Sequence, residues 1–158
     1  MAGSAVATKA ILRRARARLA LGFLQDAEED VNAAGGDVGV ARDIDEVRAN
    51  EMLILDAVGM LGEGGFDDAI GVLVEAGARA ERAGASEQFG HVVSYLGISK
   101  MQKMDWHGAA ECHKRHMELC LEVGDFEGRT RALGNLGSCY EMQGMHEDAA
   151  RCHREQVP

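Results

Sequence analysis

Four residues in the last third of the chain combine thiol and imidazole side chains at helical spacing: Cys112, His113, His116 and Cys120. Three of them follow one another at intervals of four, so a helix would place them on one face. Thiolate and imidazole are preferred ligands of Zn²⁺, and a Cys–His pair is also the inventory of a thiol nucleophile. Nucleophilic catalysis needs an oriented base in a cleft, and the sequence shows no glycine-rich elbow or oxyanion element.

The Cys-His pair recurs forty residues later as Cys152-His153, and its surroundings recur with it. The neighbours that repeat at this distance are Leu96-Gly97 with Leu136-Gly137 and Ala109-Ala110 with Ala149-Ala150. A further copy contains Leu53, Gly64 and Ala69, and a fourth, displaced by forty-two residues, contains Ala15, Gly22 and Ala27. We therefore interpret the cysteines and histidines as repeat positions that face neighbouring helices, where free cysteine acts as a small hydrophobe. We expect no metal, no cofactor and no catalytic residue.

Each repeat divides into two helical stretches. The first carries small residues where a neighbouring backbone must come close, and it ends near glycine. The second begins near an acidic pair such as Asp67-Asp68 and carries apolar residues at i, i+4 and i+7. A helix pair of this kind buries its apolar face only by stacking on neighbouring pairs. The sequence predicts a flexible segment 1–7 and an all-α repeat domain over 8–157, with helix pairs at about 10–31, 47–83, 90–123 and 130–157; a small insertion is expected between the first two pairs.

The composition agrees with a helical, globular chain. Of 158 residues, 46% are hydrophobic, 27% are charged and one is proline, which favours helix over antiparallel sheet. The net charge of −9 argues against nucleic acid or an anionic membrane as partner, and no apolar run reaches the length of a membrane span. The four cysteines include no CxxC pair and follow no secretory signal, which indicates reduced thiols in the cytoplasm.

Positive charge gathers at the N-terminus, before the first acidic residue, Asp26: Lys9, Arg13, Arg14, Arg16 and Arg18. These residues have three interpretations: a solvated helix face, a contact with an acidic partner, or an organellar targeting signal that would be cleaved. The match of "RARARLALGFLQDA" to a repeat unit argues against cleavage.

The sequence also predicts which of several residues are buried and which are exposed. Ala109 and Gly137 are expected at tight contacts between paired helices, so that leucine there would overpack the pair. The methionines expected to fill the core are Met101, Met104 and Met117. The acidic residues expected on solvated surface are Glu28, Glu29 and Asp30.

The last repeat carries Leu136, Gly137, Tyr140, Gly144 and Ala149, which resembles the tetratricopeptide (TPR) pattern. The forty-residue period and "GRTRALGNLG" resemble the Pins/LGN-type branch more specifically. This resemblance implies a right-handed superhelical array of antiparallel helix pairs, an α-solenoid, whose concave groove holds partner peptides on the first helix of each pair.

In that branch, groove asparagine and arginine side chains hold the partner, and the resemblance carries these roles to Asn135 and Arg131. The full set of groove residues expected from the register is Lys9, Arg13, Arg16, His91, Tyr95, Arg131, Asn135 and Ser138. The preceding unit offers Glu51 and Leu55 instead, so the asparagine ladder is not continuous. We expect a groove that is basic at its start, apolar in its middle and mixed at its end.

The function predicted from these features is a non-catalytic adaptor that binds a partner protein or peptide, one with acidic character, through the groove or the array ends. The alternative is a structural subunit of a large cytoskeletal, ciliary or organellar assembly; a Cys/His zinc protein ranks third. Nucleic acid and membrane insertion are not expected. The predicted compartment is the cytoplasm, or an organelle if the arginines are a targeting signal. Because Ala149, Ala150 and Cys152 would have no following unit, a partner, a second copy or a continuation of the chain is expected to cover them.

Overall fold

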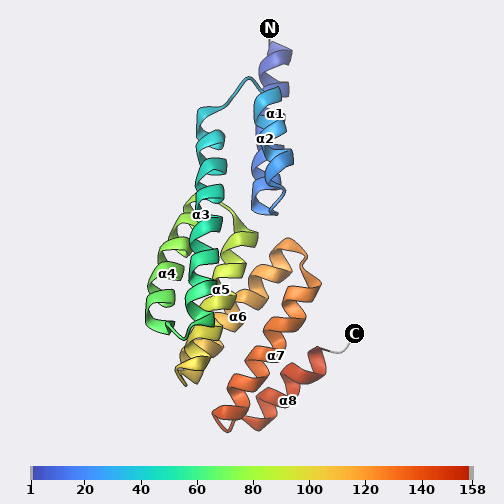
Figure 1. The fold of residues 1–158 in the computed structure, drawn as a ribbon. Coiled ribbons are helices and arrows are strands. Elements are labelled where there is room, and N and C mark those ends of the chain that lie inside the picture. The colour runs from blue at the N-terminus through green and yellow to red at the C-terminus, as the bar shows by residue number, and fades with distance from the viewer. Residues whose placement is uncertain (1, 157–158) are drawn as a thin grey trace.

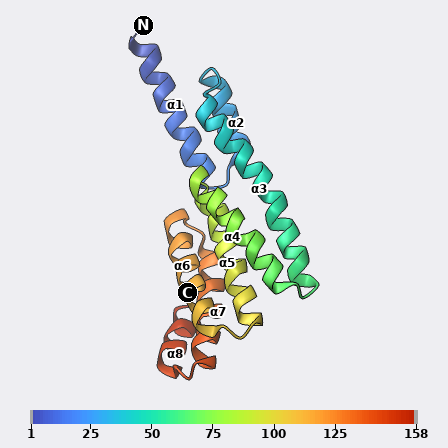
Figure 2. The same cartoon turned by 90° about the vertical axis from the view of Figure 1, so that its left-hand side faces the viewer.

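The computed structural model describes residues 2–156, and this part of the chain consists of helices without any strand (Figure 1). The helices are α1 (Ala2–Ala20), α2 (Leu24–Ala33), α3 (Val38–Gly62), α4 (Phe66–Ala83), α5 (Ser86–Gln102), α6 (Trp106–Val123), α7 (Phe126–Met142) and α8 (His146–Glu155). They form four consecutive antiparallel pairs, so the predicted all-α array of helix pairs is confirmed. Both views show the α1–α2 pair at one end of an elongated array and the α7–α8 pair at the other (Figures 1 and 2).

The helix bounds differ from the expected ones most in the first half of the chain. Helix α3 begins at Val38, whereas we expected it at about residue 47. Asp37 caps it, because its side chain accepts a hydrogen bond of 3.0 Å from the Val40 amide, and Val40, Ile44 and Val47 are buried on one face. The expected insertion is thus extra helix. Helix α1 begins at Ala2 instead of about residue 10; the flexibility of residues 1–7 stays a prediction, and Met1 lies outside the described residues.

The extension of α3 changes how the first pair stacks. The α1–α2 pair packs on the N-terminal half of α3 and on the junction of α4 and α5, in a core that includes Leu19, Val31, Ile44 and Ala83. Helix α2 packs less extensively against α3 than α4 does against α5 or α6 does against α7. The first pair is therefore the one most loosely joined to its neighbour.

Salt bridges from Arg14 and Arg18 of α1 to Asp30 of α2 connect the two helices. Asp30 is only 3% exposed, and it accepts hydrogen bonds from Arg14 Nε at 2.9 Å and from Arg18 Nη1 at 2.8 Å. The hydrogen bond from Arg14, more than any other contact, lowers the pKa of Asp30. The prediction of a solvated Asp30 is wrong, because the carboxylate lies between the two helices of the pair and is neutralised there.

Within each later pair, a small residue of the first helix faces a larger one of the second. Ala57 packs in one cluster with Leu73, whereas Gly97 faces His113 and Gly137 faces His153. A Cβ atom built on Gly97 or on Gly137 would lie 2.6 Å from the Cε1 atom of the facing histidine. Gly137 is buried and Ala109 is fully buried, as the register predicts.

Two packing predictions from the sequence need correction. Met101 and Met117 border the core of the last two pairs, but Met104 is 75% exposed, because it occupies the left-handed turn between α5 and α6 with φ of 60°. Ala149 and Cys152 are buried inside the last pair, because α8 turns that side toward α7. The outer face of α8 presents other residues: His146, Glu147, Ala150, Arg151 and Arg154.

Candidate protein-interaction site

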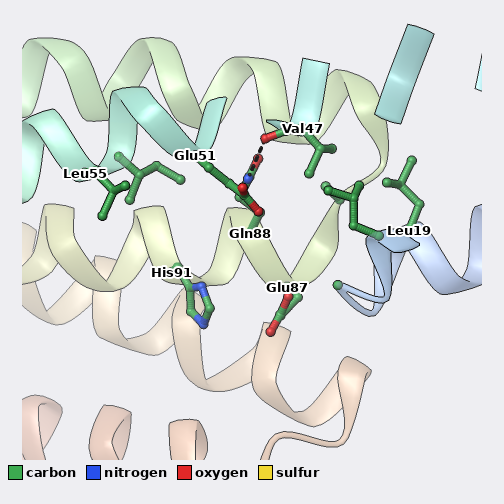
Figure 3. Close-up of a pocket in the computed structure, with 11 residues that line it drawn as sticks. Leu19, Val47, Glu51, Leu55, Glu87, Gln88 and His91 are labelled. Carbon is green, nitrogen blue, oxygen red and sulfur yellow. Dashed lines mark hydrogen bonds between the residues drawn. The ribbon is translucent and has the colours of Figure 1, made fainter. Parts of the chain in front are cut away.

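A pocket of about 310 Å³ lies between α3 and α5 and is closed at one end by the turn between α1 and α2 (Figure 3). Its lining residues are Leu19, Gly22 and Leu24 from the first pair, Val47, Glu51, Ile54 and Leu55 from α3, and Ala85, Glu87, Gln88 and His91 at the start of α5. The pocket has the size and the mostly apolar lining of a binding site. It sits where the loosely joined first pair meets the rest of the array.

The residues of α3 and α5 that line the pocket are spaced so that, on each helix, they lie on the face toward the pocket. Val47, Glu51 and Leu55 follow one another at intervals of four along α3, and Glu87 and His91 do so on α5. The turn of the first pair must come close to α5 to close the pocket. Gly22 permits this approach, because it has φ of 80° and a Cβ there would overlap the Glu87 carboxylate.

The floor of the pocket is fixed by a buried amide network. Gln88 Nε2 donates a hydrogen bond of 3.0 Å to the Val47 carbonyl, as Figure 3 shows, and Gln88 Oε1 accepts one of 2.9 Å from Asn50 Nδ2. Asn50 Nδ2 also donates to the Ala76 carbonyl at 2.7 Å. Both side chains are buried, and these bonds join α3, α4 and α5 beneath the pocket.

The ionisable groups at the pocket are two carboxylates and one imidazole: Glu51, Glu87 and His91. Within residues 2–156, neither glutamate takes part in an ion pair. Arg48 is close enough to Glu51 for an electrostatic interaction, but its guanidinium is paired with Glu28. The hydrogen bond to Glu28 is the largest cause of the raised pKa of Arg48. The pocket therefore combines apolar walls with acidic groups that have no paired cation.

Of the groove residues expected from the sequence, only His91 lines this pocket. Tyr95 is half-buried against the cluster of Ala57 and Leu73, and the Ser138 hydroxyl donates to the Gly134 carbonyl at 3.1 Å. Arg131 is exposed and Asn135 is half-buried on α7. The three expected basic residues of α1 are exposed outside the pocket: Lys9, Arg13 and Arg16.

Most of the pocket residues were not predicted from the sequence. Glu51 and Leu55 were in the correct register, and Val47 and Glu87 lie one turn before Glu51 and His91, so the helical period carried the signal for them. The helical period gave no signal for Leu19, Gly22 and Leu24, because their approach to α5 depends on how the whole α1–α2 pair packs on the rest of the array.

Three of the four Cys and His residues singled out on α6 are buried in the interior of the array, namely His113, His116 and Cys120, and Cys112 is half-buried. His113 is fully buried against Gly97, and neither ring nitrogen has a hydrogen-bond partner among the described residues. Burial, with a smaller effect of His116, lowers the pKa of His113 to about 4. Burial is also the main reason that the pKa values of Cys120 and Cys139 rise to about 11, so both remain thiols at neutral pH. In the described chain, no three His, Cys, Asp or Glu side chains are arranged to hold a metal ion.

Among the described helices, none is both long enough and apolar enough to span a bilayer.

The sequence matches no family model and no curated protein. Its fold, however, is similar to solved structures, among them the crystal structure of the TPR domain of Arabidopsis FLU. The superposition has a TM-score of 0.65 and covers 73% of this chain and 94% of that chain, with 16% sequence identity. At this identity the likeness concerns the fold alone. The chain is thus an all-α solenoid with the fold of a TPR domain.

Proposed function

We propose that the protein is a non-catalytic adaptor that seats a segment of a partner polypeptide in the pocket between α3 and α5. The observation that carries this proposal is a pocket with exposed apolar side chains beside it. Leu55, in its lining, is 63% exposed, and Met52, on the neighbouring face of α3, is 61% exposed. Apolar groups gathered around a preformed hollow are typical of a binding surface.

The binding surface is proposed to continue along α7. Arg131 and Asn135 lie on this helix at the positions that the Pins/LGN resemblance assigns to partner contacts, and both reach solvent. A guanidinium can pair with carboxylates, and an amide can both donate to and accept from a peptide backbone. Cytoplasmic localisation is part of the proposal and rests on the four free cysteines. That a partner covers the outer face of α8 also remains a proposal.

A matched pair of variants tests the proposal. Leu55→Asp places a charge in the pocket, whereas Val74→Asp places the same charge on α4, where Val74 is 58% exposed and outside the pocket lining. Affinity purification with quantitative mass spectrometry should show partners that are retained by the wild type and by Val74→Asp and are lost by Leu55→Asp. Circular dichroism should show equal helicity in all three proteins. If Leu55→Asp retains every partner of the wild type, the pocket is not the binding site.

A further inference from the structure

We infer that this pocket selects a partner segment that carries a lysine or arginine beside aliphatic side chains. The inference rests on the proposed function and adds the chemistry of the occupant. The arginines of α1 suggested an acidic partner, whereas the pocket favours a basic one.

The charged residues of the pocket favour a basic occupant. Two of the lining residues are glutamates, and none is lysine or arginine. The buried Gln88 amide is already engaged by Val47 and Asn50. The groups left to meet a ligand are the carboxylates of Glu51 and Glu87 and the imidazole of His91, so the polar contacts on offer are mainly negative.

Covering the two pocket carboxylates with an occupant that carries no cation would be unfavourable. Glu51 is exposed and Glu87 is half-buried, and in the described structure neither carboxylate forms an ion pair. A purely aliphatic occupant would remove water from them and give no partner in return, which is unfavourable. An acidic occupant would add repulsion. An ammonium or guanidinium group replaces the lost water with a charge-assisted hydrogen bond.

The shape of a basic side chain also suits the pocket. Lysine and arginine have long alkyl stems that pack on apolar surface while the charged end reaches a polar rim. Leu24, Ile54 and Leu55 offer such a surface, and Glu51 of α3 and Glu87 of α5 border the same pocket (Figure 3). The chain as a whole carries a net charge of −9, which also attracts a basic partner over longer distance.

The remaining basic groups near the first pair do not offset this preference. Arg14 and Arg18 are both engaged with the buried Asp30, and Arg48 is paired with Glu28. Lys9, Arg13 and Arg16 are exposed on α1 outside the pocket lining. An acidic segment could meet these three residues only away from the pocket.

The test uses three fluorescent peptides of one length and one leucine pattern, whose polar positions are all lysine, all glutamine or all glutamate. Fluorescence anisotropy against the full chain should give the order lysine, glutamine, glutamate from tightest to weakest. Glu51→Gln with Glu87→Gln should weaken the lysine peptide ~10-fold, bring it close to the glutamine peptide and flatten its dependence on salt. Glutamine preserves the side-chain size, so the fold is retained.

The control is Glu81→Gln with Glu111→Gln, which removes the same charge from exposed positions outside the pocket. This control should bind the lysine peptide within about twofold of the wild type. Equal loss in control and pocket variant, or tightest binding of the glutamine or glutamate peptide, would overturn the inference. In that case Leu55→Asp still decides the proposed function: it weakens all three peptides if the pocket binds polypeptide without charge selection, and it changes none if the pocket does not bind at all.

Discussion

At the scale of single residues, the repeats use two different residue pairs at the same contact between the first and second helix. The first helix supplies Ala57 where the second supplies Leu73, and Gly97 where the second supplies His113. An imidazole is flat and can lie directly on a glycine backbone, whereas an aliphatic side chain leaves room for one methyl group. The forty-residue alignment pairs these positions, but only the structure shows why the small residue changes with the large one.

The first prediction compares Gly97→Ala with Gly137→Ala. Alanine gains ~1 kcal/mol of helix propensity at both sites, so the difference between the variants isolates the contact with histidine. His113 is fully buried and cannot move aside, whereas the His153 side chain is 39% exposed and can rotate. Gly97→Ala should therefore lower the free energy of unfolding by about 1–3 kcal/mol, and Gly137→Ala by less than about 0.5 kcal/mol. Urea denaturation measures both. Equal effects would contradict the fixed position of His113.

A double variant controls for the backbone. Gly97→Ala combined with His113→Leu installs the pair that the chain already uses at Ala57 and Leu73. It should recover most of the stability lost by Gly97→Ala alone, because leucine leaves the space that the new methyl group needs. If the double variant is no more stable than the single one, the loss comes from the helix itself and not from the histidine.

The second prediction concerns pH. His113 has a pKa of about 4 in the folded chain because burial disfavours its charged form, and about 6.5 when unfolded. Between about pH 4 and pH 6.5 the imidazole of His113 is protonated in the unfolded chain and neutral in the folded chain, so the free energy of unfolding rises with pH. The stability that the neutral imidazole contributes is complete above pH ~6.5 and is lost as the pH falls toward 4. We expect the free energy of unfolding to fall by about 2 kcal/mol from this group between pH 7 and pH 5. Urea denaturation of the wild type and of the Gly97→Ala, His113→Leu protein at both pH values should show a smaller drop in the double variant.

At the scale of the helices, the turn inside each pair requires one residue in the left-handed conformation. Gly64 and Gly144 occupy it with φ of 84° and 75°, but the pair α5–α6 uses Met104, whose side chain is 75% exposed. A side chain in this conformation costs roughly 1–2 kcal/mol, and an exposed methionine regains little of that by packing.

The third prediction exchanges these residues. Met104→Gly should raise the free energy of unfolding by about 0.5–1 kcal/mol, because relief of the strained φ exceeds the extra flexibility of glycine in the unfolded chain. Gly144→Met should lower it by a comparable amount. Thermal denaturation followed by circular dichroism distinguishes the two directions. A loss of stability in Met104→Gly would show that the methionine makes packing contacts that outweigh the strain.

The same scale shows what the sequence predicts and what it does not. The helix type and the pairing followed from composition, from glycine at the helix ends and from the repeated Leu-Gly and Ala-Ala pairs, all of which act within one unit. The start of α3 at Val38 was missed, because "NAAGGDVG" shows glycines that suggest a loop while Asp37 caps a helix directly after them. Gly22 was recognised as a repeat glycine, but its contact with Glu87 requires two pairs to dock, and local patterns carry no information about that.

At the scale of the whole molecule, stability is distributed unit by unit, because each helix pair of such an array contacts mainly its neighbours. The α1–α2 pair has the smallest junction with the rest, and its two helices are held together by Asp30 with Arg14 and Arg18. The pocket lies at this junction, so its closed end depends on the order of the first pair. Local opening of the first pair would remove Leu19, Gly22 and Leu24 from the pocket without unfolding α5–α8.

The fourth prediction tests this arrangement with Asp30→Asn, which keeps the shape but removes the buried negative charge. Hydrogen exchange of the intact chain should become faster in α1 and α2, because two guanidinium groups are left without their anion, and should remain unchanged in α5–α8. Glu28→Gln is the matched control: it breaks the partly exposed pair with Arg48, which joins α2 to α3, and surface pairs of this kind contribute little.

If Asp30→Asn increases exchange equally in all eight helices, the array unfolds as one cooperative unit. In that case the pocket opens only when the whole chain unfolds, and its binding affinity should respond to every destabilising variant alike. If exchange increases in the first pair alone, binding of a partner to the pocket should restore the protection of α1 and α2 specifically, since the bound state requires their turn in place.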